Sequence, residues 1–425
     1  MKKNKLLFVQ LNEINFDELK KYSKNYNFKF FNDIFFEQLI STKSETEYQL
    51  LEPWIQWVSI YTGLDAKQHK IFRLGDIENK SYTQFYEIVE QRGYSVGAIS
   101  PMNLKNNLKN ALYFIPDPWS DSNSNNKWID KHITKTIKKF VNENSSKNKS
   151  FSDYLRLLFI FLTYFRLKNL RLLFKLTFGI KHHWNKALLC EYILNNIHLK
   201  KINKYNPDFS SIFFNAGAHI QHHYYFNSKF FDKFENPDWY VKKKYDPVFE
   251  MFKFYDKLLF EYNNKKKYDL IIATGLRQIP YDRIKYYYRL KNHKEFLSLI
   301  NINYKDVIPK MSRDFIIYFK NVENKENAIK IFEEINLMNQ KKIFSIDGRE
   351  NSIFVTLIFS EEIKDNFEIK IRDNKKINLS EYVNFIALKN GMHDQEGYYY
   401  SNFTDPSLKN NQHIKNIFEV ITNYF

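Results

Sequence analysis

The chain has 425 residues, of which 44% are hydrophobic and 18% aromatic, so it can bury a large core and is not typical of disordered proteins. It carries 65 Lys and Arg against 48 Asp and Glu, a formal charge of +17, and its single cysteine, Cys190, excludes a disulfide framework and a cysteine-based metal site. Because Lys, Asn, Ile, Phe and Tyr are frequent throughout, we attribute the average charge to composition bias rather than to a nucleic-acid partner. We expect the lone thiol to be buried.

The N-terminal segment begins with an apolar run, residues 6–11, which contains Gln10 and lacks a small-residue cleavage site. It predicts a buried first strand rather than a signal peptide. No stretch of the sequence reaches the roughly eighteen uninterrupted apolar residues that span a bilayer. We therefore expect a cytoplasmic protein, with a peripheral position at the inner face of the cytoplasmic membrane left open.

Buried strands alternate with amphipathic helices along the chain. Residues 15–23 favour a helix, residues 82–92 favour a second helix that ends at Gly93, and residues 94–99 favour a strand. Further buried strands follow in residues 207–215 and 267–274. This alternation predicts an α/β fold with a mostly parallel sheet sandwiched by helices.

Polar residues stand where three of these strands end. Asn12, Asn215 and Thr274 each follow a buried run. Ligand sites in parallel sheets lie at the carboxyl ends of the strands. The sequence therefore predicts that these three residues share one location.

A basic, apolar helical insertion is expected over residues 120–204. Residues 151–184 are dense in Leu and Phe, and cationic side chains are spaced through them: Arg156, Arg166, Lys168, Arg171, Lys175 and Lys181. The segment is too charged to span a membrane. It is typical either of a helix or helical hairpin lying in the interface of an anionic membrane, or of two ordinary core helices.

A small α+β cap is expected over residues 283–385, with a strand, a helix and two strands that meet in a turn at Asp347–Gly348. The remaining ranges, 1–119, 205–282 and 386–425, then form the α/β core.

Five short motifs occur in an order that is similar to the alkaline phosphatase superfamily, in its nucleotide pyrophosphatase/phosphodiesterase and sulfatase-like branch. They are QLNEIN after the first strand, EPWIQWVSIYTGLDAKQHKI, NAGAHIQHH, IIATGL and GMHDQEG. The resemblance covers most of the chain. It implies an alkaline-phosphatase-like sheet and a site that holds two divalent ions around a phosphate or sulfate ester.

The chain departs from the ligand set that the resemblance implies. Asn12 and Asn215 stand where the family has aspartates, and Thr274 and Gly275 replace an Asp-His pair. Two divalent ions need several anionic ligands, because neutral oxygens compensate little charge. We therefore expect a divergent member with one ion at most.

The family nucleophile is also missing. Counting back nine positions from Thr62 of the Thr-Gly pair gives Pro53, which has no nucleophilic atom. Ser59 lies on another turn of the expected helix, near its buried side, and is not expected to react. The chemically capable neighbours are Glu52 and, beside Asn12, Glu13.

A histidine group remains. His219 and His393 match the first metal site of the family, and His219 and His223, four residues apart, can share one helix face. One reading is a single divalent ion, Zn or Mn, held by His219, His393 and either Asn215 or His223. The other is a pocket without metal, in which the histidines bind an anion or a sugar by hydrogen bonds. Both readings stay open.

The catalytic candidates are Glu52 or Glu13 as general base, and His393 or His219 as acid or phosphate clamp, with Asp394 beside His393. Amide, imidazole and aromatic side chains together suit a sugar-binding pocket. The candidate substrate-binding residues are Asn12, Gln56, Trp57, Asn215, His222 and Thr274.

The expected function is that of a divergent enzyme, a transferase or hydrolase without the covalent nucleophile. Its substrate is expected to be a phosphorylated, nucleotide-linked or lipid-linked sugar in bacterial cell-envelope polysaccharide biosynthesis. The alternatives are a non-catalytic pseudoenzyme that binds glycan or phosphate ligands and an ordinary metal-dependent phosphodiesterase. The expected partners are a small-molecule or lipid-linked sugar and an anionic membrane surface.

Overall fold

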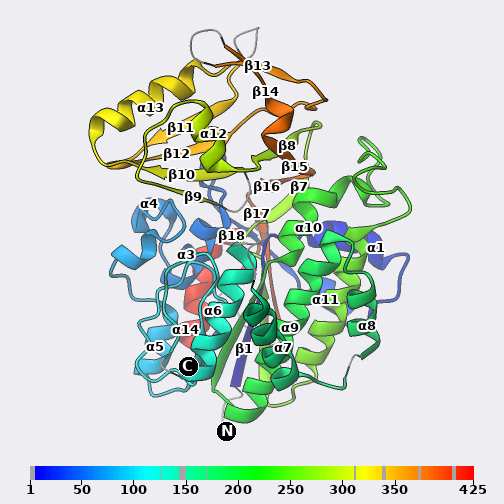
Figure 1. Cartoon of the computed structure of the whole chain (residues 1–425). Coiled ribbons are helices and arrows are strands. Elements are labelled where there is room, and N and C mark those ends of the chain that lie inside the picture. Colours follow the sequence, from blue (N-terminus) through cyan, green and yellow to red (C-terminus); the bar gives the residue numbers. More distant parts are fainter. Residues whose placement is uncertain are drawn as a thin grey trace. The chain divides into compact units, whose positions relative to one another are not determined.

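The computed structural model describes residues 5–125, 127–142, 150–168, 170–310, 313–336, 341–371, 375–403 and 408–425. The chain forms two compact units (Figure 1). The first comprises Met1–Glu235, Lys243–Pro280 and Gly391–Phe425, and the second comprises Asn236–Lys242 and Tyr281–Asn390. The predicted insertion, 120–204, lies in the first unit, and the predicted cap, 283–385, lies in the second.

An eight-stranded sheet is the centre of the first unit, in the order β18-β2-β17-β6-β1-β5-β3-β4 (Figure 1). The strands are β1 (Lys5–Leu11), β2 (Ile40–Lys43), β3 (Val96–Ile99), β4 (Tyr113–Ile115), β5 (Phe209–Phe214), β6 (Tyr268–Ala273), β17 (Glu396–Ser401) and β18 (Gln412–His413). The neighbours from β6 to β4 pair in parallel, and β17 is antiparallel to both β2 and β6. The predicted α/β fold with a mostly parallel sheet is confirmed.

Helices cover both faces of this sheet because successive strand residues point to opposite sides. Leu6 and Phe8 of β1 join the core that packs against α3 (Pro53–Thr62), α5 (Phe85–Gln91) and α14 (Ile417–Tyr424). On the other face Phe214 packs on Tyr255 of α11 (Pro247–Asn263). Next to α11 lie α9 (His183–Tyr205) and α10 (Ala216–Tyr224).

The predicted insertion forms α6 (Trp128–Asn142), α7 (Phe151–Tyr164), α8 (Leu170–Phe178) and most of α9. Cys190 on α9 is exposed, so the prediction of a buried thiol is wrong. The α9 side chains that turn inward at this level are Leu188, Glu191 and Tyr192. Among the described residues, no helix has the length and apolar character needed to cross a bilayer.

The shorter helices of the first unit are α1 (Phe16–Ser23), α2 (Asp33–Gln38) and α4 (Ala66–His69). Two further strands, β7 (Arg277–Pro280) and β16 (Gly391–Asp394), form a separate antiparallel pair. This pair carries His393 next to Gln278 in register.

The second unit is built on an antiparallel sheet in the order β11-β12-β10-β9. Its elements are β8 (Tyr286–Leu290), α12 (His293–Leu299), β9 (Asp306–Pro309), β10 (Asp314–Tyr318), α13 (Val322–Glu334), β11 (Phe344–Gly348), β12 (Ser352–Leu357), β13 (Glu368–Lys370), β14 (Lys376–Asn378) and β15 (Val383–Leu388). The predicted order of strand, helix, strand and strand is confirmed. The turn is displaced, because Gly348 still pairs with Ile353 and residues 349–351 make the connection.

A buried neutral histidine links α9 to the sheet. His198 lies with Nδ1 2.7 Å from the Tyr262 hydroxyl and Nε2 2.7 Å from Ser210 Oγ. Burial lowers the pKa of His198 to about 3, since a charged imidazole loses its hydration there.

We expect His198 to make the fold sensitive to mild acid. The unfolded chain binds a proton at this residue near pH 6.5, whereas the folded chain does not until about pH 3, so its contribution is complete above pH 6.5 and is lost as the pH falls. Between pH 7 and pH 5 the free energy of unfolding should fall by about 2 kcal/mol more in the wild type than in His198→Gln. Urea unfolding at both pH values measures this, and equal losses would contradict it.

Candidate functional site

The polar residues at the strand ends lie together, as the sequence predicts. β1 is flanked by β5 and β6, so Asn12, Asn215 and Thr274 follow three adjacent strands. The Asn12 amide donates to the Phe214 carbonyl at 2.9 Å, and the Glu13 amide donates to the Thr274 carbonyl at 3.0 Å. The turn after β1 is thereby fixed between the ends of its two neighbours.

Glu13 occupies a left-handed backbone conformation, with φ of 62°. For a residue with a Cβ this costs about 1 kcal/mol and persists where the surroundings hold it. Its carbonyl accepts from the Gln278 amide at 3.0 Å and from Gln221 Nε2 at 2.8 Å. The strained turn aims a carboxylate, 2% exposed, into the first unit.

Two histidines from distant elements meet this carboxylate. Oε2 of Glu13 lies 3.1 Å from Nε2 of His222, on α10, and 3.1 Å from Nε2 of His393, on β16. The two Nε2 atoms are 3.2 Å apart. We call Glu13, His222 and His393 the triad.

The triad fits a single divalent cation. Donor atoms about 2.1 Å from an ion and about 90–110° apart around it are separated from one another by about 3.0–3.4 Å. The three separations in the triad match that range, and one carboxylate with two imidazoles is a donor set that suits zinc or manganese. Among the described residues it is the one group of three or more such donors that is so closely gathered.

The charge state of Glu13 suits a ligand. Burial by itself raises the pKa of this carboxyl, but the charges of His393 and His222 and their hydrogen bonds outweigh it and hold the pKa below its usual range. Gln278 Nε2 also donates to Oε2. The carboxylate is thus ionised, and Asn12 donates to its other oxygen at 2.9 Å.

A buried glutamate holds the start of α10. Glu191 accepts from the Ala216 amide and, at 2.9 Å, from the Tyr255 hydroxyl, which in turn accepts from the Gly217 amide. Burial raises the pKa of Glu191 to about 7. Asn215, the N-cap residue of α10, makes no capping hydrogen bond through its side chain. The contacts of Glu191 and Tyr255 therefore satisfy the backbone amides at the start of the helix.

The prediction that His219 and His223 are metal ligands is not supported. Neither residue belongs to the triad; instead their rings pack edge to face, with centroids 4.8 Å apart. The reason is the rotation of α10. Gln221 is anchored on the Glu13 loop, and this turns His222, the next residue, toward the carboxylate. His393 is the one predicted metal ligand that the triad contains.

The amides of Asn12 and Asn215 form a closed hydrogen-bond network. Nδ2 of Asn12 donates to Oε1 of Glu13 and, at 2.8 Å, to Oδ1 of Asn215. Oδ1 of Asn12 accepts from Nε1 of Trp57 at 2.8 Å. Asn12 is therefore fully engaged in positioning its neighbours rather than offering an atom to a substrate.

Glu52 faces the triad. It is the N-cap of α3 without capping it through its side chain, and Pro53 follows as the first helical residue. Oε2 of Glu52 lies 3.8 Å from Nδ1 of His393, and the side chain is 35% exposed. Ser59 is fully buried, with Oγ 3.1 Å from Nε2 of His69, which agrees with its exclusion as a nucleophile.

Direct substrate contact is not supported for Gln56, Trp57 or Thr274. All three side chains have no exposed surface. Trp57 packs on Phe8 and Phe213, and Oγ1 of Thr274 accepts from the Tyr398 amide. The continuous burial of α3 removes the sugar-stacking surface that the sequence suggests.

Asp394 is turned away from the catalytic candidates. Successive strand residues alternate in direction, so Asp394 points to the opposite side of β16 from His393. There it accepts from Nε of Arg277 at 2.7 Å, and the same guanidinium contacts Glu396 and Tyr398. The predicted catalytic role of Asp394 does not fit this geometry.

Three supporting residues were not anticipated: Gln278, Arg277 and Glu191. Arg277 and Gln278 lie on β7, which begins four residues after the end of β6. The sequence signal that could have identified them is a pair of polar residues among apolar neighbours. Glu191 is a buried acid within a helix. Its burial could not be predicted from the sequence, because acidic residues are rarely buried.

No family model matches the chain, and no curated protein matches it significantly. Among solved structures, phosphonoacetate hydrolase from Sinorhizobium meliloti 1021 has a TM-score of 0.46 at 11% identity, over 100% of this chain and 96% of that one. Human ectonucleotide pyrophosphatase/phosphodiesterase 5 has a TM-score of 0.43 at 11% identity, over 99% of this chain and 94% of that one. The alkaline phosphatase PafA has a TM-score of 0.44 at 10% identity, over 100% of this chain and 96% of that one. These are distant likenesses at low sequence identity, and none assigns a residue role here.

Proposed function

We propose that this protein is an alkaline-phosphatase-like enzyme that transfers or hydrolyses a phosphorylated, nucleotide-linked or lipid-linked sugar. The proposal places it in bacterial cell-envelope polysaccharide biosynthesis, at the inner face of the cytoplasmic membrane. The observation that carries the chemistry is the convergence of Glu13, His222 and His393 on one point at the ends of parallel strands. Two imidazole nitrogens 3.2 Å apart beside one carboxylate oxygen suit ligands of a common ion.

The triad would hold one divalent ion, which when bound polarises a phosphoryl oxygen. Glu13 would supply the negative charge, and His222 and His393 would supply imidazole nitrogens. Gln278 and Asn12 fix the carboxylate from both of its oxygens.

Glu52 is the general base of this proposal. It lies outside the triad, is partly exposed, and faces Nδ1 of His393. It accepts the proton of an acceptor hydroxyl or water whose oxygen attacks phosphorus while the leaving oxygen departs. Pro53 occupies the place of the family nucleophile, so the displacement is direct, without a covalent enzyme adduct.

A sugar-containing substrate is supported by uncharged polar groups on and beside α10. Asn215 and His219 are partly exposed, and burial lowers the pKa of His219 to about 4, so its imidazole is neutral. Such groups hydrogen-bond hydroxyls without demanding a charge. The Asn12 network and Pro53 also favour a second candidate, a protein that binds such a ligand without turning it over.

Replacing Glu52 with glutamine separates the two candidates. For the enzyme we expect turnover of nucleotide sugars or polyprenyl-phosphate sugars to fall about 100-fold or more, with the ligand-induced rise in melting temperature retained. Glu47→Gln is the matched control, since Glu47 is an exposed acid that pairs with Lys67. A wild-type protein that is stabilised by these ligands but leaves them intact would favour the binding protein. Equal turnover in Glu52→Gln would exclude Glu52 as the base.

A further inference from the structure

An apolar surface lies on α7, α8 and the turns that follow them. Among the described residues, ten of the nineteen exposed large apolar side chains fall within residues 151–180. We call them the α7–α8 face: Phe151, Tyr154, Leu155, Leu158, Phe159, Leu162, Leu167, Phe174, Phe178 and Ile180. Phe178 is 82% exposed and Phe151 is 78% exposed. So dense a group is typical of a surface that is covered in use.

The charge of the same segment is strongly positive. Residues 151–181 contain six Lys and Arg and a single acid, Asp153. Asp153 is neutralised by Lys139 at 2.7 Å and by Arg156 at 3.4 Å. Arg166 and Lys168 pair with Glu261 and Lys175 pairs with Glu250, whereas Arg171 and Lys181 form no ion pair with a described residue. An apolar face interspersed with cations is complementary to the interface of an anionic bilayer.

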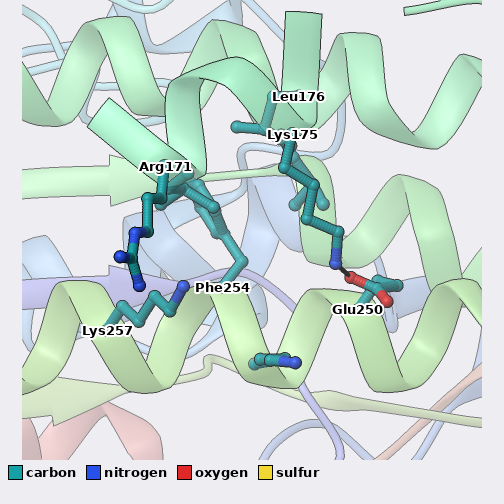
Figure 2. Close-up of a pocket in the computed structure, with 9 residues that line it drawn as sticks. Arg171, Lys175, Leu176, Glu250, Phe254 and Lys257 are labelled. Carbon is teal, nitrogen blue, oxygen red and sulfur yellow. Dashed lines mark hydrogen bonds and ion pairs between the residues drawn. The ribbon is translucent and has the colours of Figure 1, made fainter. Parts of the chain in front are cut away.

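A basic cavity of about 190 Å³ lies between α8 and α11 (Figure 2). Arg171 and Lys175 reach it from α8, and Lys253 and Lys257 from α11. Its one acid, Glu250, is paired with Lys175 (Figure 2).

Glu250, already paired with Lys175, is thus the one acid beside four cations among the described residues that line the cavity. No ion pair with a described residue engages Arg171, Lys253 or Lys257. Figure 2 shows the ends of Arg171 and Lys257 turned toward each other. Burial lowers the pKa of Lys257, and so do the charges of Lys253 and Lys175. A bound anion in this cavity would relieve that repulsion.

One helix joins the cavity to the apolar face. At 100° per residue, Phe174, Phe178, Arg171 and Lys175 all fall within about 100° of arc on α8. Leu172, buried, lies on the inner side of the helix. Arg171 and Lys175 therefore lie on the same side of α8 as Phe174 and Phe178, where cationic and exposed aromatic side chains are neighbours.

We propose that the cavity between α8 and α11 binds the phosphate headgroup of an anionic phospholipid while the α7–α8 face lies in the interface of the same bilayer. The apolar side chains supply non-specific attachment, and Arg171, Lys253 and Lys257 supply the preference for a phosphate that carries a net negative charge. This surface is separate from the triad, and its role does not depend on the proposed reaction.

The test is sedimentation of the full chain with phosphatidylcholine vesicles, with or without about 30% phosphatidylglycerol. We expect binding to tighten about tenfold or more with phosphatidylglycerol, and to weaken about tenfold or more in Arg171→Gln/Lys257→Gln. Lys266→Gln/Lys267→Gln removes two charges from an exposed turn of the same unit and should change binding less than about twofold. Phe174→Ser/Phe178→Ser should weaken binding to both kinds of vesicle.

Other outcomes would overturn the proposal. Equal losses in the two charge variants would mean diffuse attraction rather than a headgroup site. A rise in melting temperature with inorganic phosphate, without any vesicle binding, would assign the cavity to free phosphate. A wild-type dimer that Phe174→Ser/Phe178→Ser makes monomeric, again without vesicle binding, would assign the face to a second copy of the chain. All substituted side chains are exposed, so each variant should melt near the wild type.

Discussion

Replacing His222 with alanine is expected to abolish stoichiometric binding of zinc or manganese and to lower turnover about 100-fold or more, whereas His223→Ala should keep both. His222 Nε2 is 3.1 Å from the Glu13 oxygen and 3.2 Å from His393 Nε2, so its loss leaves two of three ligands. His223 is the next residue on the same helix, with the same side chain and a similar partial exposure. Elemental analysis of the dialysed protein measures the ion.

His219→Ala decides between the triad and the ligand set that the motif suggests. If His219 binds the ion with His393, this variant loses it and His222→Ala keeps it. If the triad binds the ion, the result is reversed. A wild-type protein that retains neither metal after loading would instead mean that Glu13 pairs with protonated histidine, and the site would then be the metal-free pocket.

The layout of the fold is readable from the sequence because strand burial and strand ends are local properties. Apolar runs ending at Asn12, Asn215 and Thr274 predict neighbouring parallel strands, and the structure places β1 between β5 and β6. The sequence predicts the hairpin turn at Asp347–Gly348, because Asp-Gly is a favourable turn pair. In the structure both residues belong to β11, so the turn lies a few residues later.

The rotation of α10 is not readable in the same way. His219 and His222 differ by about 60° around a helix axis. The spacing of the histidines alone does not show which of the two points toward the Glu13 carboxylate, because it provides no reference that fixes the rotation of the helix. The reference is Gln221, whose side chain bonds the backbone of Glu13 and Asn15 across the unit. A contact between residues more than 200 positions apart cannot be inferred from local spacing.

Burial of α3 was likewise hidden. The sequence predicts Gln56 and Trp57 as substrate-binding residues because amide and aromatic side chains suit a sugar pocket, but their helix, residues 53–62, is enclosed on nearly every side. A helix that is apolar all round belongs to the interior, and this general rule would have favoured the structural interpretation of Trp57.

The Asn12 network shows why an amide suits the end of β1. Its nitrogen donates at once to Glu13 Oε1 and Asn215 Oδ1, while its oxygen accepts from the Trp57 indole. Only a group with both donors and an acceptor satisfies these three partners. A carboxylate at this position would have no donor for the two oxygens that face it.

Asn12→Asp is therefore expected to destabilise the first unit by about 3 kcal/mol or more in the presence of a chelator. The change places a buried negative charge beside the Glu13 carboxylate, where like charges repel and water is excluded. Added manganese or zinc should recover part of the loss, because a cation between the two carboxylates compensates both. Urea unfolding with chelator and with metal measures the difference.

Asn12→Ala is the matched comparison, since it removes the same hydrogen bonds without adding charge. It should cost less than Asn12→Asp in chelator, and metal should not rescue it beyond the wild-type response. If the two variants were equally stable, repulsion between the carboxylates would not determine the stability of the site, and avoiding it would not explain the amide at position 12. If instead metal raises the stability of Asn12→Asp alone, the added carboxylate takes part in binding the cation.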